Sequence, residues 1–109
     1  MERFSVRTVD DGQRSLIVAV GEIDLAVADR LWTELDPAIT ADRTVVLDCS
    51  GVRFLDSMGL RILIKALRKA DSVGARFQLA DPTPIVRRVL DLSGVAEAFD
   101  GSPSGYAST

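Results

Sequence analysis

The chain has 109 residues, of which 47% are hydrophobic and 27% charged, as expected for one globular domain that buries a core without metal or disulfide support. Its net charge of −3 argues against a nucleic-acid-binding protein, and no apolar run is long enough to span a membrane. With no histidine and a single cysteine, Cys49, it lacks histidine-based nucleophile and metal sites and an intrachain disulfide.

The chain begins with a predicted β-hairpin. Residues 4–9 alternate apolar and polar side chains, which is typical of a strand with one solvent-exposed face. The Asp-Gly pair at 11–12 is a hairpin turn signal. Residues 15–21 are almost all apolar, so we expect a second strand that is buried on both faces.

A helix and a strand are predicted next. Apolar residues recur at helical spacing from Leu25 to Leu35, with Asp24 as the expected N-cap and Pro37 as the expected end. Residues 44–48 predict a buried strand. Cys49-Ser50-Gly51 reads as a turn after that strand.

The second predicted helix begins at Ser57 and ends before Gly74, a residue suited to the left-handed position after a helix. Its apolar stripe consists of Leu60, Leu63, Ile64, Leu67 and Ala70. Residues 76–80 follow as a buried strand.

The last part of the chain predicts a third helix. Thr83 is its expected cap, Pro84 its first residue and Gly94 its stop. Residues 96–99 are expected to form a short final strand, and the small polar residues 101–109 a disordered tail.

These elements predict a single α/β domain over residues 1–100. Strand-helix-strand units of this length require right-handed crossovers and parallel pairing. We therefore expect a mixed β-sheet, with an N-terminal antiparallel hairpin plus parallel strands and with helices packed on it.

Functional groups of parallel α/β units gather beyond the carboxyl ends of the strands. Asp24, Asp48, Asp56 and Asp81 are predicted to crowd that edge, although each is also explained as a cap or a turn former. Ser57, at the start of a helix, is by itself most simply an N-cap hydroxyl. Gly59 in the first turn weakens the helix but permits close approach of another surface.

Four segments, in order, resemble a known family. Residues 54–60 (FLDSMGL) are similar to the phosphorylation-site motif of STAS-domain anti-sigma factor antagonists. Residues 21–24 (GEID), 46–52 (VLDCSGV) and 89–95 (VLDLSGV) resemble further elements of that family, and the resemblance runs from about residue 4 to 99. Cys49 and Met58 depart from the usual Leu and Ser, which leaves the Asp56-Ser57 pair intact.

The resemblance implies a cytoplasmic regulator without catalytic residues, metal or cofactor. Its unmodified form would bind an anti-sigma factor that is also a GHKL-type serine kinase, and so release a sigma factor. Phosphorylation at the position of Ser57 would end the binding, and a PP2C-type phosphatase would reverse it. Neither nucleic acid nor membrane is an expected partner. The residues expected to contact the partner are Glu22, Ile23, Asp24, Leu55, Asp56, Met58, Gly59 and Arg61.

Leu55, Met58 and Ile23 are expected to form the apolar rim of this contact, and Arg61 and Lys65 to meet acidic partner residues. For Arg68 and Lys69 a solvated helix face is the simpler expectation. One alternative keeps the fold, as a non-phosphorylated STAS scaffold or regulatory subunit of a transporter or signalling assembly. An enzyme that uses Ser57 is disfavoured, because the sequence offers neither a suitable base nor a phosphate-cradling glycine loop.

Overall fold

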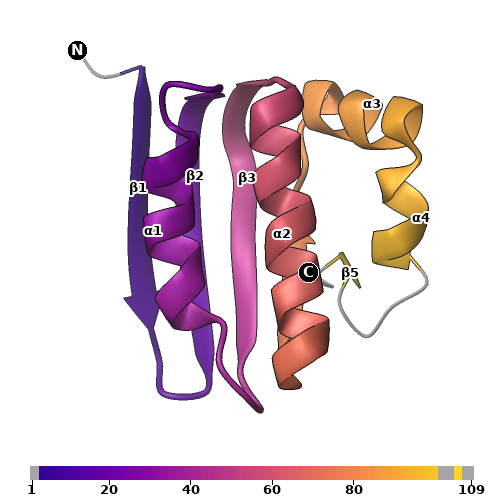
Figure 1. Ribbon diagram of the computed structural model, residues 1–109. Coiled ribbons are helices and arrows are strands. Elements are labelled where there is room, and N and C mark those ends of the chain that lie inside the picture. The colour runs from indigo at the N-terminus through magenta and orange to yellow at the C-terminus, as the bar shows by residue number, and fades with distance from the viewer. Residues whose placement is uncertain (1–2, 101–104, 107–109) are drawn as a thin grey trace.

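The computed structural model describes residues 3–100 and 105–106, and their central feature is a five-stranded sheet in the order β1-β2-β3-β4-β5 (Figure 1). The strands are β1 (Phe4–Asp10), β2 (Arg14–Ile23), β3 (Thr44–Leu55), β4 (Arg76–Ala80) and β5 (Gly105–Tyr106). The helices are α1 (Ala28–Ala38), α2 (Ser57–Val73), α3 (Pro84–Ser93) and α4 (Val95–Asp100). None of the helices in this part of the chain is long and apolar enough to cross a membrane.

Strand pairing matches the predicted scheme. β1 and β2 form an antiparallel hairpin, and the pairs β2-β3, β3-β4 and β4-β5 are parallel. Because parallel neighbours need a crossover, α1 connects β2 to β3 and α2 connects β3 to β4. The predicted α/β class, with a hairpin at the edge of a mixed sheet, is therefore confirmed.

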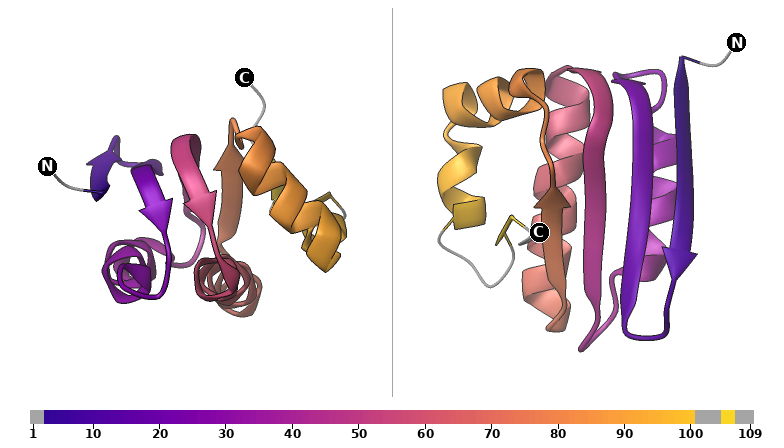
Figure 2. Two further views of the ribbon diagram at one scale, coloured as in Figure 1. Left: turned by 90° about the horizontal axis from the view of Figure 1, so that it is seen from above. Right: turned by 180° about the vertical axis from the view of Figure 1, so that it is seen from behind.

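The helices are distributed unevenly over the two faces of the sheet. α1 and α2 cover one face, whereas α3 and α4 lie beyond β4, and within residues 3–100 no helix covers the other face of β1 and β2 (Figure 2). In β2, Ile17 and Ala19 are fully buried, whereas Leu16 and Val20 are 37% and 39% exposed. The prediction that residues 15–21 are buried on both faces is wrong, because only one face of β2 carries helices.

β3 is longer than predicted. Cys49-Ser50-Gly51 belongs to the strand and is not a turn, although the register with β2 shifts between Val18 and Val20. Beyond this irregularity Gly51 pairs with Val20, and after a second shift between Gly21 and Glu22 the ladder continues to the end of both strands. Pairing with β2 thus overrides the local turn preference and carries β3 on to the start of α2.

α1 begins and ends later than predicted. Asp24 does not cap it: its backbone oxygen accepts from the N–H of Val27 at 3.1 Å and its carboxylate from the N–H of Ala26 at 3.0 Å, so residues 24–27 form a separate turn. Pro37 lies inside α1, one residue before its end. The helix persists there because the N–H of Ile39 still reaches the carbonyl of Leu35 at 3.2 Å.

Most helix boundaries in the second half were predicted correctly. Gly74 and Gly94, both with positive φ, directly follow the last residues of α2 and α3, and Pro84 is the first residue of α3. Thr83 occupies the expected N-cap position of α3, but its hydroxyl makes no cap bond. It donates instead to the carbonyl of Val52 at 2.8 Å and so ties the start of α3 to β3.

The C-terminal part differs from the prediction. Residues 96–99 lie in α4 and not in a strand, because Ala96 and Phe99 are both buried and their spacing of three puts them on one helix face. The ring of Phe99 lies 6.0 Å from that of Phe77. Within the tail predicted as disordered, Gly105–Tyr106 forms β5, which pairs with the open edge of β4 and corrects the prediction for these two residues. The other residues of the tail lie outside the described part of the chain.

Candidate functional site

The candidate site lies where the carboxyl ends of β2 and β3 meet the start of α2. Ile23 and Leu55 end the two strands as register partners. The N–H of Asp56 then donates to the carbonyl of Ile23 at 3.1 Å, which ties the β3-α2 junction to β2. This junction therefore brings the 21–24 and 54–60 segments together, as the strand-end argument predicted.

Asp56 is the N-cap of α2. Its Oδ1 accepts from the N–H groups of Met58 and Gly59, both at 2.9 Å. Its Oδ2 accepts from the N–H of Leu25 at 3.2 Å, across the junction. The view of Ser57 as an N-cap hydroxyl is therefore wrong, because the preceding carboxylate already satisfies the first-turn amides.

Ser57 is the first residue of α2 and its side chain is exposed. Its hydroxyl makes no hydrogen bond to any residue that the structure describes. No base is therefore positioned to activate it among these residues, since the Asp56 carboxylate is oriented toward backbone amides. The arrangement suits a hydroxyl that accepts a group from an external enzyme.

Three of the expected contact residues are buried. Ile23 is 1% and Leu55 is 4% exposed, and Gly59 is buried beneath the first turn. A β-carbon at Gly59 would lie 2.6 Å from Leu55 Cδ1 and 2.9 Å from the Ile23 carbonyl oxygen. The close approach predicted at Gly59 is thus internal, and the expectation of an exposed rim that includes Leu55 and Ile23 is wrong.

Two exposed apolar residues beside the junction were missed by sequence reasoning. Leu25 is 68% exposed and Phe54 is 42% exposed. Helical spacing predicts Leu25 as part of the apolar stripe of the first helix, but it lies in the turn before α1 and is exposed. Phe54 precedes buried Leu55, and the alternation of a strand places it on the opposite face.

The carboxylates do not all gather at this edge. Asp24 is here, 21% exposed and paired with Arg3 at 3.2 Å, and Glu22 is half-buried at the end of β2. Asp48 lies within β3, opposite Ala80 at the end of β4. Because β3 continues to Leu55 while β4 stops level with Asp48, neither Asp48 nor the following Asp81 reaches the junction.

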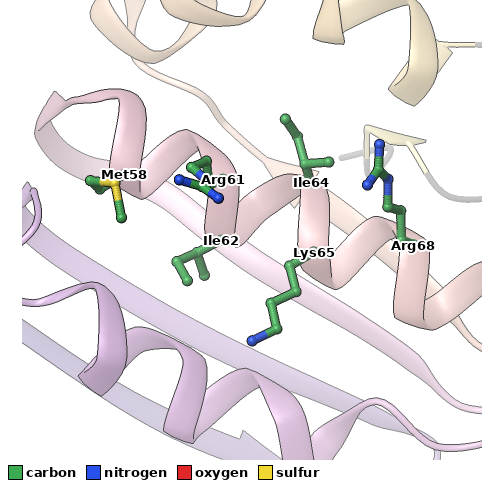
Figure 3. Close-up of a pocket in the computed structure, with 6 residues that line it drawn as sticks. All are labelled: Met58, Arg61, Ile62, Ile64, Lys65 and Arg68. Atoms are coloured by element: carbon green, nitrogen blue, oxygen red, sulfur yellow. The ribbon is translucent and has the colours of Figure 1, made fainter.

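Two further expectations concern α2 and Cys49. Met58 is half-buried, Arg61 is exposed, and both line a shallow cavity along α2 (Figure 3). Lys69, expected on a solvated face, instead pairs with Asp36 of α1. Burial, with a smaller effect of Asp48, raises the pKa of the Cys49 thiol to about 12, so this thiol is not a nucleophile near neutral pH.

Comparison with known proteins gives one family model and several similar proteins. The family model described as "Mlab, STAS domain" matches residues 6–99, which include every predicted site residue. The anti-sigma F factor antagonist of Paenibacillus polymyxa is 30% identical over 77 residues, which cover 69% of this chain and 66% of that protein. The anti-sigma-F factor antagonist RsfB of Mycobacterium tuberculosis is 28% identical over 99 residues, covering 90% and 80%. The crystal structure of an anti-sigma factor antagonist from Mycobacterium paratuberculosis aligns with a TM-score of 0.79 and 26% identity, covering 96% of this chain and 86% of that one.

Proposed function

We propose that this chain, which belongs to the STAS domain family, is an anti-sigma factor antagonist switched by phosphorylation of Ser57. The unmodified protein binds an anti-sigma factor that is also a GHKL-type serine kinase, and this binding frees a sigma factor. The kinase phosphorylates Ser57 and thereby ends the binding, and a PP2C-type phosphatase restores the active form. The proposal places the protein in the cytoplasm, where its kinase has ATP, and gives the chain no catalytic step of its own.

One structural observation carries the proposal: Ser57 is an exposed, unbonded hydroxyl at the first position of a helix whose start is fixed by Asp56. A kinase needs a side chain that it can reach, and a binding switch needs that side chain inside a surface of defined shape. The antagonist names of the relatives from Paenibacillus polymyxa and Mycobacterium tuberculosis support the same role.

The local charges explain why a phosphate would end binding. Phosphorylation adds about −1.5 to −2 charges at neutral pH. A free helix N-terminus would attract that charge, but Asp56 already occupies the amides of Met58 and Gly59. The dianion therefore lies next to the Asp56 carboxylate, and docking must bring this added negative charge into an interface.

The fold itself should tolerate the modification. Ser57 is exposed and its hydroxyl holds no described partner, so a phosphate displaces no internal contact. A mismatched charge brought into an interface costs about 2–5 kcal/mol. Since about 1.4 kcal/mol is a tenfold change, the expected loss of affinity is about a hundredfold or more.

The direct test is incubation with candidate anti-sigma kinases and ATP, followed by mass-spectrometric mapping of the modified residue. The expected result is one phosphate on Ser57 and none on Ser57→Ala, which should still bind the kinase. Modification elsewhere, or no modification by a kinase that binds the chain, would refute the proposal. Recovery of a transport ATPase and no anti-sigma kinase in a pull-down would favour the scaffold function instead.

A further inference from the structure

One side of α2 continues from Ser57 as a row of side chains at successive turns. Arg61, Ile64 and Arg68 follow Ser57 at spacings of four, seven and eleven residues, which places all four on the same helix face. Lys65 lies beside this row (Figure 3). The row runs for about 16 Å along the helix from the candidate phosphorylation site.

The cations of this row are without carboxylate partners in the described part of the chain. Arg61 and Arg68 are exposed and have no ion pair there. The Lys65 ammonium lies 4.3 Å from the ring centroid of Trp32, a contact with an aromatic face and not with an anion. By contrast, Arg43 and Lys69 are paired with carboxylates of the chain.

Apolar side chains accompany the cations. Met58, Ile62 and Ile64 are half-buried and, together with Arg61, Lys65 and Arg68, line a shallow cavity of about 540 Å³ (Figure 3). We call these six residues the α2 basic face. A solvated helix face has no need of this apolar surface, whereas a docking surface combines apolar contact with charges that select the partner.

We propose that the α2 basic face docks an acidic, amphipathic segment of the kinase partner, a proposal that rests on the proposed function. Carboxylates of such a segment would meet Arg61, Lys65 and Arg68, and its apolar side chains would fill the cavity. The charge is complementary to an acidic peptide but not to a nucleic acid, because the chain carries a net charge of −3 and the Asp56 carboxylate lies at the start of the same helix.

The α2 basic face is also coupled to the switch. A phosphate on Ser57 would lie one helical turn before Arg61, the favourable order for an anion and a cation spaced four residues apart. It would compete with the partner's carboxylates for Arg61. Phosphorylation thereby opposes docking on both sides of Ser57, by repulsion at Asp56 and by occupation of Arg61.

The test compares two double variants that each remove two positive charges. Arg61→Gln/Arg68→Gln changes the α2 basic face and leaves Lys65 on Trp32, whereas Arg14→Gln/Arg88→Gln changes exposed arginines elsewhere. We expect the first variant to bind the kinase about tenfold more weakly than the wild type, mainly because it associates more slowly, and the control variant to bind as the wild type does. At high salt, the difference in association rate between the first variant and the wild type should disappear. Equal affinities of the two variants would overturn the proposal while leaving the switch at Ser57 in place.

A second measurement tests the α2 basic face independently of the kinase. If no kinase binds the chain, the proposed function is refuted, but this second test of the α2 basic face can still be made. An amphipathic synthetic peptide of glutamate and leucine at helical spacing is titrated into the isotope-labelled full chain. Saturable amide shifts along residues 58–68, absent in Arg61→Gln/Arg68→Gln, are the expected result. The assignment to an acidic partner would be overturned if these residues show no saturable shift. It would also be overturned if the chain forms a dimer that is lost in Arg61→Gln/Arg68→Gln and kept in the control variant.

Discussion

Replacing Asp56 by alanine should destabilise the protein while the neighbouring Ser57→Ala should not. The Asp56 carboxylate accepts three backbone N–H groups, two from α2 and one from Leu25, so the substitution removes the cap and the link to the turn before α1. Loss of an N-cap costs about 0.5–2 kcal/mol, and the half-buried position of Asp56 and its third hydrogen bond point to the upper part of this range. For a chain of 109 residues, 1 kcal/mol corresponds to about 4 °C in the unfolding temperature.

Thermal and urea unfolding, followed by circular dichroism, measure this difference. Asp56→Asn separates the two functions of the carboxylate, because its single amide oxygen can still cap α2 but its NH₂ group cannot accept from Leu25. We expect near wild-type stability with faster hydrogen exchange at the Leu25 amide. If Asp56→Ala unfolds at the same temperature as Ser57→Ala, the described cap is not what holds the site together.

Three further predictions concern other parts of the molecule. Gly59→Ala should lower the free energy of unfolding by about 1–2 kcal/mol despite the better helix propensity of alanine, because the new β-carbon would lie 2.9 Å from the Ile23 carbonyl oxygen. Urea unfolding measures this change, and an unchanged free energy of unfolding would contradict the described packing. Hydrogen bonds, of which the one from the Gly12 N–H has the largest effect, lower the pKa of Asp10 below its ordinary 3.8. The stabilisation that they give the fold is therefore present above pH 3.8 and is lost as the pH falls through the lowered pKa. Unfolding measured as a function of pH should show that Asp10→Asn loses less stability on acidification than the wild type does. Thiol reagents near neutral pH should modify Cys49 only after denaturation, and rapid labelling of the native protein would show that this thiol is not buried.

Sequence patterns predicted the features that depend on local chemistry. The Asp-Gly turn, Pro84 at the start of α3 and the glycines that end α2 and α3 all lie where backbone preference alone requires them. The parallel order of β2, β3 and β4 followed from the crossover rule. These regularities were enough to bring the 21–24 and 54–60 segments to one junction.

Features that depend on tertiary contacts were beyond the sequence pattern. Cys49-Ser50-Gly51 has turn-forming residues, yet pairing with β2 keeps it extended. Leu25 matches the helical spacing of the residues after it, but the turn at Asp24 and the hydrogen bond to Asp56 hold it outside α1. Leu25 was missed because of this turn, and Phe54 because β3 extends past the predicted turn at 49–51.

The affinity of the kinase partner for the unmodified and the Ser57-phosphorylated protein, measured side by side by calorimetry, tests the switch most directly. The account predicts a loss of about a hundredfold or more on phosphorylation, with an unchanged unfolding temperature, and a weaker but parallel loss for Ser57→Asp. Equal affinities of the two forms, or a loss of binding that accompanies unfolding of the domain, would contradict it.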